Sequence, residues 1–167
     1  MFEKPEILYF FLTAPVLFYI VFSDLKFMRI FNASNILLFC LFFVTAPFLY
    51  ELSDFSWRLL AAVIALGIGF FLNLVGLMGG GDAKFLPAAA PYIAFSDYTT
   101  VLLLLAFFSI LTVVVHRTIV LIPSFNRVVG DWESWNNPKM NGRAAVPYGV
   151  ALALTLSVYL FLKAFIV

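Results

Sequence analysis

The sequence Gly79-Gly80-Gly81-Asp82-Ala83-Lys84 places a carboxylate directly after a run of three glycines. Strongly apolar segments lie on both sides of it, at about 57–77 and 83–95. A carboxylate at membrane depth costs roughly 2.5–3.5 kcal/mol on insertion scales, so an acid in such a position indicates function. The other apolar segments decide where Asp82 lies and which groups it can meet.

The composition predicts an integral membrane protein. Of the 167 residues, 64% are apolar and 11% are charged, and the mean hydropathy is +1.06. A soluble domain is nearer half apolar and a quarter charged. The length predicts a single domain over residues 1–167. Because the N-terminal sequence has no basic region before its first apolar run, we expect that run to be a retained span and not a signal peptide.

Six apolar segments predict an all-α, polytopic membrane helix bundle of about six transmembrane helices. They lie at about 5–23, 33–50, 57–77, 83–95, 98–122 and 144–166. Most of them reach the ~20 residues of helix that cross a hydrocarbon core. The fourth would cover only about 20 Å at 1.5 Å per residue, so a re-entrant segment is the alternative.

The distribution of Lys and Arg favours six crossings. With the N-terminus outside, seven basic residues fall on the cytoplasmic side and three outside, as the positive-inside rule requires. If the fourth segment does not cross, the count becomes four against six. The seven are Lys26, Arg29, Lys84, Arg117, Arg127, Lys139 and Arg143, and the three are Lys4, Arg58 and Lys163.

The long loop 123–143 and the single cysteine, Cys40, each have a simple interpretation. The long cytoplasmic loop 123–143 carries Trp132 and Trp135 among polar residues, which predicts a segment at the membrane interface, either an anchor or a cover over a substrate. Cys40 lies in an apolar run, and we interpret it as a buried apolar thiol. A single cysteine can build neither a disulfide framework nor a Cys-based zinc site.

Two acids fall at the cytoplasmic ends of predicted spans, Asp24 closing the first and Asp82 opening the fourth. In a compact bundle their side chains can meet. Two carboxyl groups within a few ångströms do not both ionise readily, so one is protonated and the other ionised. Such a pair can activate a water against a peptide carbonyl. The ionised member takes the proton of the water, and the protonated member polarises the carbonyl and then protonates the leaving nitrogen.

Each of these residues also has a purely structural interpretation. Asp24 can cap a helix or pair with Lys26 or Arg29. Asp82 suits the N-cap of a helix, a role that does not exclude catalysis. The glycines can serve close helix packing, whereas a backbone break at 79–81 would let an extended substrate approach the acid.

The remaining polar residues give no sign of a metal or nucleotide site. His116 has no His, Cys or Glu at ligand spacing, so no metal site is predicted. The sequence has no P-loop, HExxH or G-x-S-x-G motif, and no basic patch with interleaved aromatic residues for nucleic acid. Lys84 either extends to lipid phosphates or is a cation that tunes Asp82 or steers the substrate. We expect no metal and no organic cofactor.

Three stretches resemble motifs of the type IV prepilin peptidases, which are membrane aspartic proteases with a G-x-G-D motif. Met78–Leu86 resembles the G-x-G-D region, Ser23–Asn32 the first-aspartate motif, and Val146–Ala151 the Pro-Tyr-Gly motif that opens the last span. The three occur in the family's order. Phe31 is a departure, because the family usually has Pro there, while Asn32 is kept.

The resemblance implies an aspartic endopeptidase that removes the basic leader of type IV prepilins or pseudopilins, with water as the nucleophile. It implies that Asp24 and Asp82 are the catalytic pair and that Gly79 and Gly81 shape the site. It places the protein in the bacterial inner membrane, with cleavage at the cytoplasmic face. Five further positions match family motifs and have less certain roles: Lys84, Asn32, Pro147, Tyr148 and Gly149.

The short connection between the first two spans refines this resemblance. Bifunctional family members carry an insertion there with paired CxxC motifs and also N-methylate the new N-terminus. This chain has one Cys and no such insertion, so it resembles the short, peptidase-only type associated with Flp/Tad pili, often called the CpaA or TadV type. We expect a prepilin within the bilayer as partner, no nucleic acid and no methyltransferase domain.

Two other functions are alternatives. A non-catalytic membrane component, such as an assembly platform or transporter subunit, could share the fold, although transporters more often place charges at mid-span. A related G-x-G-D protease could act on another membrane-anchored protein, such as a preflagellin-like substrate.

Overall fold

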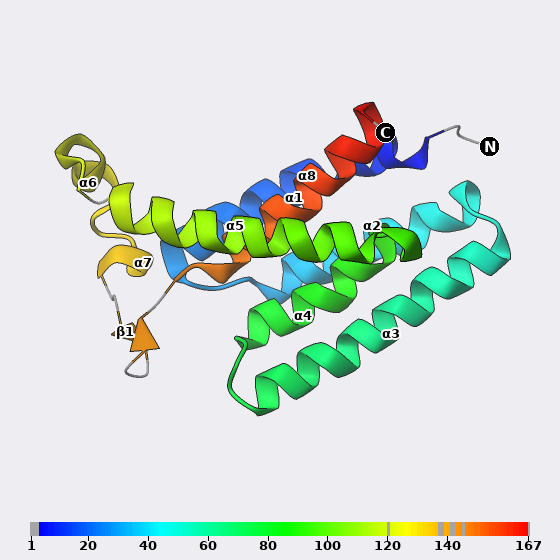
Figure 1. Ribbon diagram of the computed structural model, residues 1–167, viewed down its shortest axis with the longest axis horizontal. Helices are drawn as coiled ribbons and strands as arrows, with labels where there is room; N and C mark the ends of the chain where they lie inside the picture. Colours follow the sequence, from blue (N-terminus) through cyan, green and yellow to red (C-terminus); the bar gives the residue numbers. More distant parts are fainter. Residues whose placement is uncertain (1–3, 120, 137–138, 141–142, 145, 167) are drawn as a thin grey trace.

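The computed structural model describes residues 4–119, 121–136, 139–140, 143–144 and 146–166. Its helices lie along one common long axis (Figure 1). Five of them are long and apolar enough to cross a membrane, so the predicted all-α membrane helix bundle is confirmed. These five are α1 (Pro5–Phe27), α2 (Asn32–Leu49), α3 (Leu52–Leu74), α5 (Tyr98–Ile119) and α8 (Tyr148–Phe165).

The fourth predicted span is much shorter than the others. Helix α4 (Gly80–Ala89) has 10 residues, about 15 Å at the rise of an α-helix. Two 3₁₀ turns follow it, η1 (Ala90–Tyr92) and η2 (Phe95–Asp97). In Figure 1, α3 runs toward the end of the bundle where α4 begins, and α5 starts near the opposite end. α4, η1 and η2 together therefore carry the chain back to the opposite end of the bundle, although α4 is not among the long spans.

The bundle has two ends, which we name after one acid each. The Asp24 end, on the left in Figure 1, holds the end of α1 and the start of α4. The Asp97 end, on the right, holds the start of α1 and the end of α8 (Figure 1).

The segment between α5 and α8 lies at the Asp24 end (Figure 1). It contains α6 (Pro123–Val129), α7 (Glu133–Asn136) and two short antiparallel strands, β1 (Lys139–Met140) and β2 (Arg143–Ala144). Both tryptophans pack against the bundle. The Trp132 ring lies 5.7 Å from the Phe22 ring of α1, and Trp135 Nε1 donates to the carbonyl oxygen of His116 at 2.9 Å.

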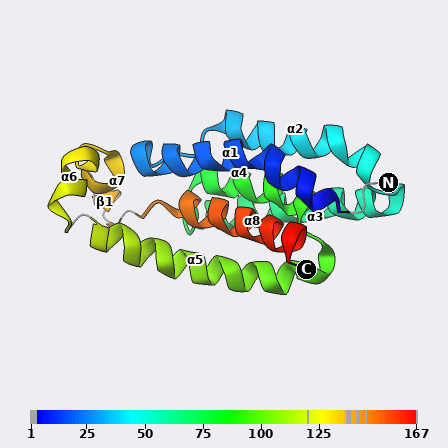
Figure 2. The same ribbon diagram turned by 90° about the horizontal axis from the view of Figure 1, so that it is seen from above.

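Helix α8 is the most buried of the five long helices, and it packs against α1 and α5 (Figure 2). An aromatic cluster holds α1, α2 and η1 together nearer the Asp97 end. The Tyr9 ring lies 4.9 Å from Tyr92 and 5.7 Å from Phe42. The Tyr92 hydroxyl donates to the carbonyl oxygen of Leu38 at 2.7 Å. This buried bond satisfies the polar end of an otherwise apolar ring.

Most of the outward-facing surface of the long helices is apolar, as a lipid-facing surface requires. Phe18, Phe48 and Leu103 are each more than two-thirds exposed. Cys40 also lies on the exposed side of α2, so our interpretation of a buried thiol was wrong. An apolar run does not tell which of its members face lipid, because neighbouring helices and lipid are both apolar surroundings.

Candidate active site

Asp24 lies in the last turn of α1, with only 4% of its surface exposed. The helix ends because Met28 adopts the left-handed conformation (φ 51°) and donates its N–H to the Asp24 carbonyl oxygen at 2.9 Å. α1 extends beyond the apolar run because the Lys26 ammonium lies over the rings of Phe22 and Phe27, at 5.5 and 5.3 Å.

Asp82 occupies the third position of α4, because Gly79 is the N-cap. Its carboxyl group faces the backbone N–H of Gly79, in the position of the third residue of a capping box. A Cβ at Gly79 would lie 3.0 Å from Oδ2 of Asp82. The structure therefore corrects the N-cap interpretation of Asp82: Gly79 is the N-cap, and the acid lies inside the first turn and is half-buried.

The first turn of α8 lies against Asp24. The backbone N–H groups of Gly149 and Val150 face the Asp24 carboxyl, although its Oδ2 makes no hydrogen bond of full geometry within the described residues. A Cβ at Gly149 would lie 2.9 Å from that Oδ2. Pro147, the N-cap of α8, is fully buried. Only glycine at 149 lets the helix start approach the acid this closely.

Ile30 joins these parts. It lies in the connection between α1 and α2 and is 6% exposed. A Cβ at Gly81 would lie 2.9 Å from the Ile30 carbonyl oxygen, and one at Gly149 would lie 2.7 Å from Ile30 Cδ1. The Ile30 residue thus fills the space between the starts of α4 and α8, and both glycines are required for that contact.

Two asparagines of α2 bind the start of α4. Asn35 Nδ2 donates to the carbonyl oxygen of Gly81 at 3.1 Å, and Lys84 Nζ donates to Asn32 Oδ1 at 3.0 Å. Lys84 is exposed, and its described partner is Asn32, not the carboxylate of Asp82. This motif lysine and motif asparagine therefore act as a pair between α2 and α4.

Two further contacts complete the surroundings. A Cβ at Gly69 of α3 would collide with the carbonyl oxygen of Ala83, so that glycine lets α4 lie directly on α3. Tyr148 faces α5, where its hydroxyl lies within hydrogen-bond distance of Ser109 Oγ, at 3.3 Å. Among the motif residues, Tyr148 is thus directed toward α5 and not toward the acids.

The two predicted catalytic acids are near enough that the charge of Asp82 acts on the Asp24 carboxyl. Among the described residues neither acid has a cation as partner, because the single ion pair found there joins Asp97 and Lys163 at the other end. Our structural interpretation of Asp24 as a partner of Lys26 or Arg29 was therefore wrong. Within the same residues no group of three or more His, Cys, Asp or Glu side chains could hold a metal.

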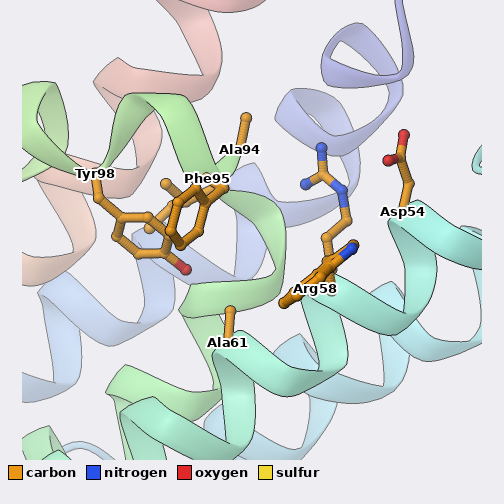
Figure 3. Close-up of a pocket in the computed structure, with 8 residues that line it drawn as sticks. Asp54, Arg58, Ala61, Ala94, Phe95 and Tyr98 are labelled. Atoms are coloured by element: carbon orange, nitrogen blue, oxygen red, sulfur yellow. The ribbon is translucent and has the colours of Figure 1, made fainter.

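A separate cavity of about 400 Å³ lies near the Asp97 end and contains neither acid. Figure 3 shows Asp54 and Arg58 on α3 and Tyr98 across from them. Arg58 Nη1 donates to the carbonyl oxygen of Pro91 at 2.8 Å, and its guanidinium lies 4.0 Å from the Tyr50 ring. These contacts hold α3 to η1, and they give Arg58 a structural role.

A family model described as the type IV leader peptidase family matches residues 11–115, which is more than half of the chain. The chain belongs to the type IV leader peptidase family. The matched part contains both acids and the whole of α4, while the start of α8 lies beyond it. No curated protein and no solved structure matches the chain.

Two residues of this leader peptidase's site escaped sequence reasoning: Ile30 and Asn35. Ile30 is an apolar residue in a short connection, and nothing in the sequence marks it. Asn35 carries a weak signal, because it is an amide inside an apolar run and needs a partner there. For Gly69, in contrast, the sequence permits close helix packing through a small residue, and its contact with the backbone of Ala83 agrees with that interpretation.

Proposed function

We propose that this chain is an aspartic endopeptidase that removes the basic leader of Flp/Tad-like type IV prepilins or pseudopilins, with Asp24 and Asp82 as its catalytic pair. Family membership supports leader peptidase activity in general. The observation that carries the finer proposal is the convergence of two acids, from α1 and α4, at one end of the bundle, where the described residues give them no cation.

In this mechanism the pair shares one proton. Two neighbouring carboxyl groups favour the state in which one is protonated and one ionised. The ionised carboxylate accepts a proton from water as the water attacks the scissile carbonyl, and the other carboxyl donates a hydrogen bond to the carbonyl oxygen. That carboxyl then protonates the leaving nitrogen, so that the dyad again holds one proton, now on the carboxyl that accepted it from water.

The surroundings support the positions of both acids. The carboxyl of Asp82 is oriented by the N–H of Gly79, and that of Asp24 by the start of α8. Ile30, which fills the space between the starts of α4 and α8, fixes these two helix starts relative to each other. Pre-oriented groups of this kind reduce the cost of reaching the reactive geometry.

The proposal also covers location and topology. The Asp24 end would face the cytoplasm of a bacterial inner membrane, because the positive-inside count puts most Lys and Arg residues there. The basic leader of a prepilin would remain at that face, and its apolar helix would lie beside the bundle. The chain would act as one domain over residues 1–167.

The test is co-expression with a prepilin and detection of leader release by mass. Asp24→Asn and Asp82→Asn should each lower the rate by at least about a thousandfold, since each removes one proton-transfer partner. Both variants should still insert and elute as the wild type does in detergent. Asp54→Asn, an exposed acid of α3, is the matched control and should process normally. Wild-type processing by either dyad variant would refute the assignment.

A further inference from the structure

A second cavity at the Asp24 end has no role in the mechanism above. It has a volume of about 470 Å³ and lies between α5, α8 and the α6–α7 segment. Its described walls are almost entirely apolar and include Leu111, Val115, Phe125 and Leu154. Cavities of roughly 300–1,000 Å³ with apolar walls and a few polar groups are typical of ligand sites.

Two polar side chains line this apolar cavity, Thr112 and His116, one turn apart on α5. They are 7% and 5% exposed. Within the described residues, the two ring nitrogens of His116 have no hydrogen-bond partner, and the hydroxyl of Thr112 has none either. Buried polar atoms without partners are unfavourable, so three of them along one cavity wall indicate that a ligand completes the site.

Thr112 differs from two other hydroxyl residues of α5, Ser109 and Thr118. Ser109 Oγ donates to the carbonyl oxygen of Leu105 at 2.6 Å, and Thr118 Oγ1 donates to that of Val114 at 2.9 Å. Both bonds run to the residue four positions earlier, the usual partner of a hydroxyl in an apolar helix. Thr112 makes no such bond in the described structure, and its hydroxyl is therefore available to a ligand.

The His116 ring is held in place. It stacks on the Trp135 ring, with centroids 4.6 Å apart and planes 15° from parallel. Trp135 in turn donates its indole N–H to the His116 carbonyl oxygen at 2.9 Å. A fixed imidazole beside a fixed hydroxyl forms a preorganised hydrogen-bonding wall, and preorganisation lowers the cost of binding.

The cavity shares its wall with the candidate active site. Leu25, which follows Asp24 directly, lines it, and so does Val150. The backbone N–H of Val150 faces the Asp24 carboxyl. A chain bound at the acids therefore has this cavity beside it.

We propose that this cavity is a specificity pocket for an apolar side chain on the mature side of the scissile bond, with His116 and Thr112 binding the adjoining peptide group. The inference rests on the proposed function. A peptide group carries one donor and one acceptor, and a neutral imidazole and a hydroxyl each offer both. Among the described residues the apolar lining includes no acid, so it suits the apolar mature segment and not the basic leader. A lipid acyl chain would leave all three polar atoms without partners.

The experiment uses detergent-purified protein and a set of prepilin reporters. Each reporter carries Phe at one of the first four residues after the cut and Ala at the other three. Wild-type protein should cleave one of them with a kcat/KM at least about tenfold above the all-Ala reporter, the usual discrimination by an apolar pocket. Leu154→Trp, which fills the cavity, should bring that ratio close to one.

Thr112→Val should lower kcat/KM for the preferred reporter about tenfold, as loss of one hydrogen bond does.

Matched changes outside the cavity serve as controls. Thr118→Val removes a hydroxyl from the same helix, and Leu103→Phe adds an aromatic ring on its lipid-facing side. Neither should change the ratio. A photoreactive benzoylphenylalanine at position 154, in an Asp82→Asn background that retains substrate, should crosslink to the prepilin, and one at position 103 should not.

Some outcomes would overturn the pocket without touching the proposed function. These are a wild type that releases leaders with equal kcat/KM for all reporters, a ratio that survives Leu154→Trp, or crosslinks at 154 to lipid alone. Absence of leader release by the wild type would instead refute the proposed function itself.

Discussion

The two ends of the bundle each hold a buried or half-buried acid, and the two ends treat it differently. At the Asp97 end, Asp97 Oδ2 lies 3.0 Å from Lys163 Nζ and accepts the Tyr159 hydroxyl at 3.0 Å. Ser96 Oγ donates to its other oxygen at 3.2 Å. At the Asp24 end, Asp24 has a second acid nearby, and the described residues give it no cation.

Under the proposed function, this difference separates a structural acid, Asp97, from a catalytic one, Asp24. An acid that is saturated by a cation and hydroxyls stabilises the contact between α8 and the η2 turn, and it has no free capacity for proton transfer. An acid left with another acid is costly for stability and is found where its chemistry is used. Residue type and burial alone would not distinguish the two ends, whereas their partners do.

Among the substitutions that test this contrast, we expect the largest loss of activity from one beside Asp24, at Gly149. A Cβ there would lie 2.7 Å from Ile30 Cδ1 and 2.9 Å from Asp24 Oδ2, so Gly149→Ala must displace the start of α8 or the acid. Because a displacement of about 1 Å can cost around a hundredfold in rate, we expect leader release to fall by about that factor, measured as kcat/KM.

A matched glycine provides the control for this change. A Cβ at Gly67 of α3 would meet no atom within 4 Å. Gly67→Ala should leave the rate unchanged and raise stability by up to about 1 kcal/mol, the helix preference of Ala over Gly. Equal rates for Gly149→Ala and wild type would show that the close approach of α8 to Asp24 is not needed for activity.

A smaller effect, on stability, is expected at the other end. Asp97→Asn removes the ion pair with Lys163 while leaving an amide that can still accept from Tyr159. The partners are only 17% and 28% exposed, so we expect a loss of about 1–2 kcal/mol, in the range of charged hydrogen bonds. Thermal unfolding in detergent measures it. Leader release should stay within about twofold of wild type, and a large loss of activity would remove the contrast between the ends.

The smallest effect is expected at Phe31, the position that departs from the family motif. Its backbone already has φ −72° and ψ 141°, which a proline ring fits without strain. Phe31→Pro would lose ring contacts with Tyr19 and Phe27 but restrict the unfolded chain, a gain of about 0.4–1 kcal/mol. We expect near-wild-type leader release and a midpoint of thermal unfolding within a few degrees. Strong inactivation would show that the aromatic ring itself supports the site.

Sequence patterns predicted the helices well because their signal is local. Long apolar runs located all five long helices, and the two acids stood out because charges are rare beside such runs. The end of α1 was misplaced by four residues, since Lys26 remains in the helix over aromatic rings. That contact depends on side-chain reach, which hydropathy does not record.

The arrangement of the candidate site could not be read in the same way. The Ile30 contact depends on three segments that meet only after folding, and any apolar residue in that connection would look alike in sequence. The cavity beside His116 could not be predicted either, because it depends on α6 and α7 packing over α5. Interactions between distant segments leave no periodic trace in a single sequence.

The dependence of Asp24 on the first turn of α8 also bears on how the protein is made. Ribosomes deliver the N-terminal segments first, at roughly 5–20 residues per second. A growing chain therefore carries Asp24 and Asp82 in the membrane for several seconds before Gly149 and Val150 are synthesised. During that interval the acid lacks the backbone groups that orient it. Under the proposed function, the catalytic pair would therefore be completed only when insertion of the chain is nearly finished.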